Sequence, residues 1–235
     1  MSFLTHPFTL RVRRTLRRTK LAGLLTKPLR SRSYEKTVDE ALLRSIKPAD
    51  VVWDVGANLG HYCSRLSDAV GDSGRVVAFE PSPANLERLR ETVGKNTNLS
   101  ILPFGLSSKA GRMSFVQGDD PLGATSHLAA PSEIRGACLS EIELRRGDEL
   151  VALNVAPAPD VIKIDVEGHE LEVIEGLGNL LERPRLRALV IEVHFGILAG
   201  LGRPEASRQI ELKLENAGFS LHWIDLSHLL ATRRI

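Results

Sequence analysis

The spacing of apolar residues changes period repeatedly along the chain, and each change indicates a new element. Val38, Leu42 and Ile46 recur at helical spacing, and Lys47-Pro48 ends the segment. The β-branched run at 51–55 follows without polar alternation. Such a run is typical of a strand buried on both faces, so the pattern predicts a helix followed by a central strand.

The same succession of helix and strand continues to the end of the chain. Further strands are predicted over 75–80, 99–104, 113–116, 160–165, 186–193 and 218–225, with another near 142–144. Helices are predicted over 62–70, 83–93, 171–181 and 204–217. Strands that alternate with helices of this length build right-handed crossovers and a mainly parallel sheet. We therefore expect one Rossmann-like α/β domain over residues 34–235, behind an extension at 1–33.

The segment Asp54-Val-Gly56-Ala-Asn58-Leu-Gly60 joins the predicted strand 51–55 to the next helix. A sharp turn from strand to helix brings the backbone close to a ligand, and a side chain at Gly56 would block that approach. Gly60 allows the helix to start against the strand. Asp54 ends the strand where open α/β sheets bind ligands, so it can pair with a cationic amine such as that of a methionine moiety. The segment predicts a ligand-binding turn.

A second acid, Glu80, ends the next predicted strand, twenty residues beyond Gly60. A carboxylate at this position can accept both hydroxyls of an adenosine ribose. A glycine turn or a strand-end acid alone is a weak signal. The two in this order and spacing favour a nucleoside ligand.

The residues of the turn favour S-adenosylmethionine over a dinucleotide. A dinucleotide fingerprint has a second glycine where this chain has Asn58, because the backbone approaches a pyrophosphate there. Asp54 would also face an anionic diphosphate. S-adenosylmethionine carries a sulfonium and no phosphate, so the acid suits it better.

Five segments in order resemble the FkbM-type methyltransferase family: VVWDVGANLGHYCSRL, VVAFEPSPANLERLRE, LPFGLSSKAGRMSF, PDVIKIDVEGHELEVIEGL and LVIEVH, within residues 50–196. The resemblance implies a Rossmann-like fold, S-adenosylmethionine as cofactor and methyl transfer, commonly to a hydroxyl of a sugar or another small metabolite. By the same resemblance Asp54, Gly56, Asn58 and Gly60 would hold the methionine end and Glu80 the ribose.

Three further positions follow from the resemblance. Gly105 and Leu106, after the third predicted strand, would lie near adenine. Asp165, within IKIDVEG, would lie at the mouth where the methyl group is transferred. The Arg-rich extension is outside the matched region, so the resemblance says nothing about it.

Acids and histidines follow two strands predicted to be neighbours. Asp165, Glu167 and His169 come after one strand, and Glu192 and His194 end the next. Because the carboxyl ends of parallel strands meet in one crevice, these groups can converge. A hydroxyl acceptor benefits from a general base, and our candidates for catalysis are Asp165, His194 and His169.

Each of these candidates also has a purely structural interpretation. Asp165 can satisfy backbone donors at the start of a helix, and either histidine can be a hydrogen-bonded core or surface residue. The acids of this region have no spacing diagnostic of a metal, so no metal ligand is predicted.

Composition and charge narrow the classes of protein. The 43% hydrophobic and 26% charged residues are those of a globular protein, and the 5% aromatic residues argue against a stacking-rich RNA-binding surface. Two cysteines, Cys63 and Cys138, make no disulfide framework, which favours a reducing, cytoplasmic setting. A small-molecule acceptor with a hydroxyl is the expected partner, and nucleic acid is not expected.

The positive charge is concentrated in the extension. Residues 1–36 hold ten Lys and Arg and one acid, Glu35, which leaves 21 basic and 28 acidic residues for the rest. An anionic membrane surface, nucleic acid and an organelle-targeting role all remain open for this arm, as does a solvated arm without a partner. For the whole chain, an NAD(P)-dependent oxidoreductase and a non-catalytic cofactor-binding module are the alternatives to a methyltransferase.

Overall fold

The computed structural model describes residues 32–94, 96–116, 127–128 and 139–233. Its helices are α3 (Arg32–Ser45), α4 (Cys63–Val70), α5 (Pro83–Val93), α6 (Gly147–Ala152), α7 (Glu170–Leu177), the 3₁₀ helix η2 (Gly178–Glu182), α8 (Phe195–Gly200) and α9 (Ala206–Asn216). Its strands are β1 (Val51–Val55), β2 (Arg75–Phe79), β3 (Leu99–Leu102), β4 (Gly105–Leu106), β5 (Gly111–Val116), β6 (His127–Leu128), β7 (Leu139–Arg145), β8 (Val161–Ile164), β9 (Ala188–Glu192), β10 (Phe219–Trp223) and β11 (His228–Arg233).

The main sheet has seven strands in the order β10-β11-β9-β8-β1-β2-β3. The pairs from β9 to β3 are all parallel, and β11 pairs antiparallel with both β9 and β10. The chain order reverses between β1 and β8, and a crevice forms beyond the carboxyl ends of the strands at such a reversal. This sheet confirms the predicted mainly parallel Rossmann-like fold.

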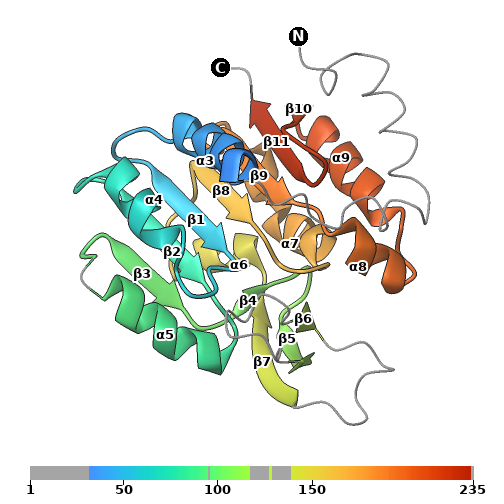
Figure 1. The fold of residues 1–235 in the computed structure, drawn as a ribbon, viewed down its shortest axis with the longest axis horizontal. Helices are drawn as coiled ribbons and strands as arrows, with labels where there is room; N and C mark the ends of the chain where they lie inside the picture. The colour runs from blue at the N-terminus through green and yellow to red at the C-terminus, as the bar shows by residue number, and fades with distance from the viewer. Residues whose placement is uncertain (1–31, 95, 117–126, 129–138, 234–235) are drawn as a thin grey trace.

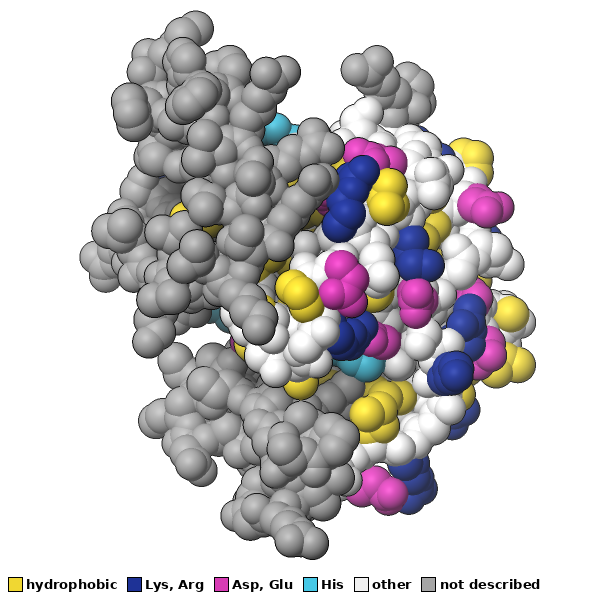
Figure 2. Space-filling view, turned by 90° about the vertical axis from the view of Figure 1, so that its right-hand side faces the viewer, with side chains coloured by type: hydrophobic (Ala, Val, Ile, Leu, Met, Phe, Trp, Pro, Cys, Tyr) yellow, Lys and Arg dark blue, Asp and Glu magenta, His cyan; other side chains and the backbone are white. Residues whose placement is uncertain are grey.

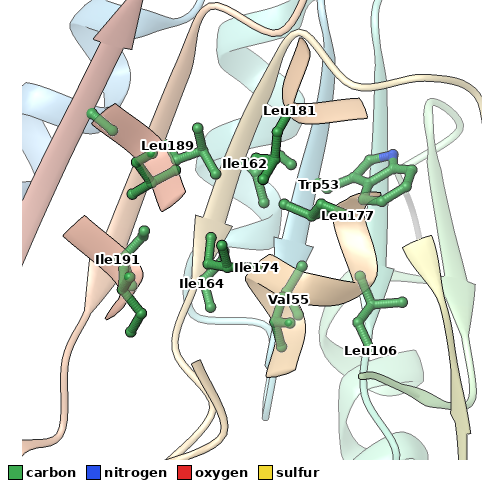
Figure 3. Packing of buried hydrophobic residues seen from close by; sticks show 14 of the residues in the cluster. Trp53, Val55, Leu106, Ile162, Ile164, Ile174, Leu177, Leu181, Leu189 and Ile191 are labelled. Atoms are coloured by element: carbon green, nitrogen blue, oxygen red, sulfur yellow. The ribbon is translucent and has the colours of Figure 1, made fainter. Parts of the chain in front are cut away.

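Helices cover both faces of this sheet (Figure 1). Val38 and Leu42 of α3 pack with α4 on one face, and α5 continues the same layer. The larger core lies on the opposite face, beneath α6, α7 and α9 (Figure 3). Its largest member, Trp53, has no exposed surface and meets the Phe79 ring edge-on at 5.0 Å between centroids. The buried run at 51–55 is therefore explained by helices on both sides.

The amino ends of the strands are joined by a balanced ion network. Asp160 Oδ2 accepts hydrogen bonds from the Val51 backbone N–H at 2.8 Å and from Arg185 Nη2 at 2.9 Å. Arg187 bridges Asp160 Oδ1 at 3.2 Å and Asp50 Oδ2 at 2.6 Å. Two arginines thus balance two largely buried acids, which fixes the register of β1, β8 and β9 at this edge.

Several elements were not among the sequence predictions. The predicted strands at 113–116 and 142–144 are found as β5 and β7, but their place in a second, four-stranded sheet of order β4-β7-β5-β6 beyond the carboxyl ends of the main strands was not predicted (Figure 1). Helices α6 and α8 have six residues each, too short for a helical period to be recognised. The predicted helix 171–181 changes to η2 at Gly178, whose φ is +48°. Strand β11 follows a tight turn in which Asp225 Oδ1 accepts from the backbone N–H of His228 at 2.7 Å.

None of the helices in the described ranges is long and apolar enough to cross a bilayer. Acidic and basic side chains are interspersed over the described part of the face in Figure 2, which is the side of α8 and α9 in Figure 1. Residues 1–31 of the predicted basic arm lie outside the described residues.

Candidate active site at the carboxyl edge of the sheet

The loop after β1 is shaped by backbone that few side chains tolerate. Gly56, Asn58 and Gly60 have φ of +81°, +50° and +85°. A Cβ on Gly56 would lie 1.9 Å from the backbone oxygen of Asp165. Gly56 is therefore required by the close approach of the end of β8 to the loop, and its predicted role in leaving space for a ligand stays a prediction.

Gly60 has a similar packing role against a different element. A Cβ at this position would lie 2.7 Å from Leu89 Cδ1 and 3.0 Å from Val93 Cγ1, both on α5. The sequence suggested that Gly60 lets the following helix start against β1. The structure shows that it instead lets the loop pack against α5, which begins after β2.

Glu80 ties the β1 loop to the end of β2. Its Oε2 accepts the backbone N–H of Asn58 at 2.8 Å, and its Oε1 accepts that of Ser82 at 2.8 Å. Burial raises the pKa of Glu80 even though these hydrogen bonds lower it. Oε1 also accepts from Asn85 Nδ2 at 3.5 Å, so the second lone pair of Oε2 is the one left to accept a further hydrogen bond.

Asp54 is fully buried and already has a cationic partner inside the protein. Its Oδ1 lies 3.1 Å from Lys163 Nζ, and its Oδ2 accepts from Cys63 Sγ at 3.4 Å. Burial by itself lowers the pKa of Lys163, but the charges of Asp54 and Asp165 outweigh it and raise that pKa. The sequence analysis predicted that Asp54 pairs with the amine of a methionine moiety. In the structure, the ammonium group of Lys163 already occupies that position beside Asp54.

Sequence reasoning missed this role of Lys163. A lysine within a strand buried on both faces was the available signal, because a buried ammonium requires an acid nearby. The partner follows from the register, in which Lys163 of β8 stands directly opposite Asp54 of β1.

Gly105 and Leu106 form β4, which pairs with β7 of the small sheet. The Leu106 side chain is 2% exposed and belongs to the main core (Figure 3). A Cβ on Gly105 would lie 2.9 Å from Leu144 Cδ2. The suggested contact with adenine would therefore involve the backbone of this strand, and it stays a prediction.

The ends of β8 and β9 bring three of the predicted residues together. Asp165 and Glu167 follow β8, and His194 follows the neighbouring parallel strand β9. His194 Nε2 lies 3.2 Å from Glu167 Oε2 and 3.7 Å from Asp165 Oδ1. Asp165 Oδ2 also lies 3.6 Å from Lys163 Nζ, which links this group to Asp54.

His194 is held from its other side by an acid with no exposed surface. Its Nδ1 lies 2.6 Å from Glu170 Oε1, which also accepts the Gly168 backbone N–H at 2.9 Å. Burial lowers the pKa of His194, but hydrogen bonds to Glu167 and Glu170 raise it well above its ordinary value. With acids at both ring nitrogens, His194 is better placed to position Asp165 and Glu167 than to take a proton from an acceptor, and Asp165 becomes the better candidate for a base.

A second histidine, His228, was missed because it lies on the unpredicted strand β11. Its Nε2 is 3.3 Å from Glu192 Oε2, and its Nδ1 is 2.9 Å from Asp225 Oδ2. Burial lowers the pKa of His228, but these two acids raise it to about 9. Burial in turn raises the pKa of Glu192, and His228 lowers it to about 2. His228 is therefore a fixed positive charge beside the site.

His169, the third predicted catalytic residue, lies apart from this group. Its Nε2 is 2.9 Å from Ser107 Oγ and its Nδ1 is 3.4 Å from Glu172 Oε2. Burial lowers the pKa of His169. With both nitrogens directed to neighbours other than Asp165, His169 has the contacts of a structural histidine.

A small hollow of about 20 Å³ opens between α3 and the carboxyl halves of β8 and β9. It combines an apolar wall from α3 with polar groups of the site. These lining residues are Val38, Leu42, Tyr62, Lys163, Ile164, Asp165, Val190, Glu192 and His228. The hollow therefore connects the acids of the site with the surface beside α3.

Comparison with known proteins places this arrangement among methyltransferases. Residues 54–221 match the family described as the methyltransferase FkbM domain. The hexuronic acid methyltransferase AglP of Haloferax volcanii is 36% identical over 165 residues, which are 69% of this chain and 64% of that protein. The 2-O-methyltransferase NoeI of Sinorhizobium fredii is 28% identical over 151 residues, which are 59% and 62% of the two chains. The chain thus spans less than two thirds of the length of these relatives.

Solved structures agree on the fold. A chain of a fibrillarin–Nop5p complex superposes with a TM-score of 0.51 at 17% identity, over 93% of this chain and 82% of the other. At this identity the likeness concerns the arrangement of helices and strands alone.

Proposed function

The chain belongs to the FkbM family of S-adenosylmethionine-dependent methyltransferases, and from that premise we propose that it methylates a hydroxyl group of a sugar acid or a similar small metabolite. The observation that carries the proposal is that three candidate groups follow the carboxyl ends of neighbouring parallel strands. The glycine loop follows β1, Glu80 follows β2, and Asp165 follows β8. A nucleoside cofactor bound at the first two would direct its methionine end toward the third.

The cofactor would be held by backbone more than by charge. Glu80 already orients the loop through Asn58, and the second lone pair of its Oε2 would accept from a ribose hydroxyl. Asp54 has no exposed surface, so we assign it a positioning role: it holds Lys163 and thereby fixes the spacing of β1 and β8. This replaces direct pairing of Asp54 with the methionine amine.

Methyl transfer itself is an in-line displacement at carbon. The acceptor oxygen attacks the methyl carbon, the carbon–sulfur bond breaks, and its electron pair stays on sulfur to give S-adenosylhomocysteine. The acceptor hydroxyl must lose its proton, and Asp165, whose side chain is 30% exposed, would take it. His194 would hold Asp165 and Glu167 in place through its Nε2. Positioning of the two reactants supplies most of the remaining gain in rate.

The class of acceptor is suggested by the relatives. The name of AglP specifies a hexuronic acid as its substrate, and that of NoeI specifies 2-O-methylation. The hollow beside α3 borders Lys163 and His228, two cations, and the acids Asp165 and Glu192. A polyhydroxylated acceptor that carries a carboxylate would complement this mixture of charges.

Transfer of labelled methyl groups tests the proposal. The full chain is incubated with S-adenosyl-[methyl-³H]methionine and a panel of glucuronic and galacturonic acid glycosides, beside neutral glycosides. We expect label in the uronic acids, and a loss of about 100-fold in the Asp165→Asn variant. The matched control, Asp68→Asn on the exposed side of α4, should keep full activity.

Thermal stabilisation by added ligands separates a methyltransferase from the two alternative functions. S-adenosylmethionine and S-adenosylhomocysteine should raise the melting temperature, whereas NAD and NADP should not. Stabilisation by the nicotinamide compounds alone would reject a methyltransferase and favour an oxidoreductase. Binding of S-adenosylmethionine without transfer to any hydroxyl compound would favour a non-catalytic binding module.

For the basic arm at residues 1–33 we propose contact with an anionic membrane surface, on the basis of its composition alone. Deletion of the arm should abolish co-sedimentation with vesicles of 30% phosphatidylserine while leaving the response to S-adenosylmethionine unchanged. Equal co-sedimentation of the full and truncated chains would reject the contact.

A further inference from the structure

The group around His194 contains more acceptors than the protein can satisfy. Three carboxylate oxygens lie within 4.0 Å of His194 Nε2, on Glu167 at 3.2 Å, Asp165 at 3.7 Å and Glu192 at 4.0 Å. A ring nitrogen carries a single hydrogen, so it can donate a good hydrogen bond to one of these oxygens. Asp165 also contacts Lys163, and Glu192 also contacts His228, so three basic side chains serve the whole connected group of acids. The basic side chains are Lys163, His194 and His228, and the acids are Asp54, Asp165, Glu167, Glu170, Glu192 and Asp225. Such a surplus of buried negative charge is favourable when a further cation lies among the acids.

Three of these side chains have the geometry of a ligand set. One atom each of Asp165, Glu167 and His194 lies within 4.8 Å of the other two, and all three residues are half-buried. Asp165 and Glu167 come from the turn after β8 and His194 from the turn after β9, so the set is fixed by two neighbouring strands. Lys163 contacts Asp165 through Oδ2, which leaves Oδ1 directed at His194.

A second observation concerns the other ring nitrogen of His194. Its Nδ1 contacts Glu170 Oε1 at 2.6 Å, and Glu170 has no exposed surface. The second oxygen of that carboxylate, Oε2, has no hydrogen-bond partner within the described residues. A histidine that binds a metal usually donates its other N–H to a carboxylate in this way, which fixes the ring and directs the free nitrogen at the ion.

We propose that Asp165, Glu167 and His194 bind one divalent metal cation at the carboxyl edge of the sheet, with Glu170 orienting the histidine. Two carboxylate oxygens and one imidazole nitrogen suit Mg²⁺, Mn²⁺ or another first-row divalent ion. Three protein ligands leave coordination positions open for water or for an acceptor hydroxyl. The site goes beyond the sequence analysis, which predicted no metal ligand.

The second histidine of this edge, His228, differs from His194 in that its acids match its ring nitrogens in number. Each nitrogen of His228 has one acid, Glu192 at 3.3 Å and Asp225 at 2.9 Å, so two protons serve two carboxylates. At His194, Glu192 is already held by His228 and Asp165 by Lys163, but Glu167 and Glu170 have His194 as their shared basic partner among the described residues. The surplus of acid is therefore local to the proposed cation site.

A bound cation would add to the proposed reaction through the acceptor. A hydroxyl coordinated to a divalent cation has a lower pKa, so its proton leaves more easily as the methyl group arrives. This consequence rests on the proposed function, whereas binding of the cation does not. The two can therefore fail separately.

Titration with Mn²⁺ tests the site without cofactor or acceptor. The full chain, without a histidine tag and treated with a chelator, is titrated while the electron paramagnetic resonance signal of free Mn²⁺ is recorded. We expect one bound ion per chain. Glu167→Gln and His194→Gln should each weaken binding at least tenfold, and Glu170→Gln should weaken it by about 10–100-fold. His222→Gln, on an exposed histidine of β10, is the matched control and should bind as the parent chain does.

Two results would overturn the site. One is no stoichiometric binding up to about 1 mM Mn²⁺, the weak end of natural divalent-cation sites. The other is equal affinity in Glu167→Gln and the parent chain. Glu167 is half-buried, so this variant is expected to fold even where Glu170→Gln does not, and far-ultraviolet circular dichroism verifies it. Stabilisation by S-adenosylmethionine in the presence of chelator, measured on the same samples, reports separately on cofactor binding.

Discussion

The two edges of the main sheet use charge in opposite ways. At the amino ends of the strands, Asp50 and Asp160 are matched by Arg185 and Arg187, and every carboxylate has a guanidinium. At the carboxyl ends, the acids around His194 outnumber the protons available to them. A balanced network stabilises one structure, whereas an unbalanced one is favourable when a cationic ligand completes it. The amino edge of the sheet therefore stabilises the fold, whereas the carboxyl edge holds the candidate active site.

The largest effect is expected at the amino edge. Arg187→Met would leave Asp50 without its guanidinium and Asp160 with one fewer, and removal of one partner from a buried ion network costs about 3–5 kcal/mol of unfolding free energy. Urea denaturation measures this loss. S-adenosylmethionine affinity per folded molecule should not change. A variant that kept its stability but lost cofactor affinity would abolish the distinction between the edges.

The next effect concerns pH at the carboxyl edge. The folded pKa of His228, about 9, exceeds the unfolded value near 6.5, so its ion pairs contribute fully below pH 6.5 and are lost as the pH rises through 9. We expect unfolding free energy to fall by about 3 kcal/mol across that window. His228→Gln should flatten the slope, and denaturation curves at half-unit pH intervals measure it. An unchanged slope in the variant would show that other groups titrate instead.

Substitution of Asp165 is expected to change the unfolding free energy little and the turnover strongly. Asp165→Asn should reduce turnover by about 100-fold, equivalent to roughly 2.7 kcal/mol of barrier. Its unfolding free energy should stay close to that of the parent chain, because the side chain is 30% exposed. Steady-state methyl transfer and urea denaturation on the same preparations separate the two quantities. Equal losses of stability and turnover would make Asp165 a structural residue.

Much of the fold could be predicted because its core is patterned locally. The run at 51–55 and the N-cap at Ser82, which accepts from Asn85 N–H at 3.4 Å, both depend on neighbours in the sequence. The convergence of Asp165 and His194 follows from one rule on parallel strands. The small sheet and β11 depend on long-range pairing, which a hydrophobic period does not report.

The site was predicted in its residue types and only partly in its contacts. The pairing of Asp54 with Lys163 joins residues 109 positions apart, and it requires the register of β1 against β8. The clash that makes Gly56 necessary lies on that same neighbouring strand. The acid–histidine arrangement of Glu170 and His194 likewise spans two turns. In each case the missing information was which strand ends are neighbours and in which register the strands pair.

Isothermal titration with S-adenosylmethionine tests most directly whether the cofactor binds at the ends of β1 and β2 and not at the acids around His194. Glu80→Gln keeps the size of the side chain but removes the charge and one of the two accepting oxygens that would hold the loop and the ribose, so its dissociation constant should rise at least tenfold. Glu167→Gln lies beyond the cofactor, and its dissociation constant should stay within about twofold of the parent chain. Unaltered binding in Glu80→Gln, with a loss in Glu167→Gln, would contradict a cofactor seated between the ends of β1 and β2.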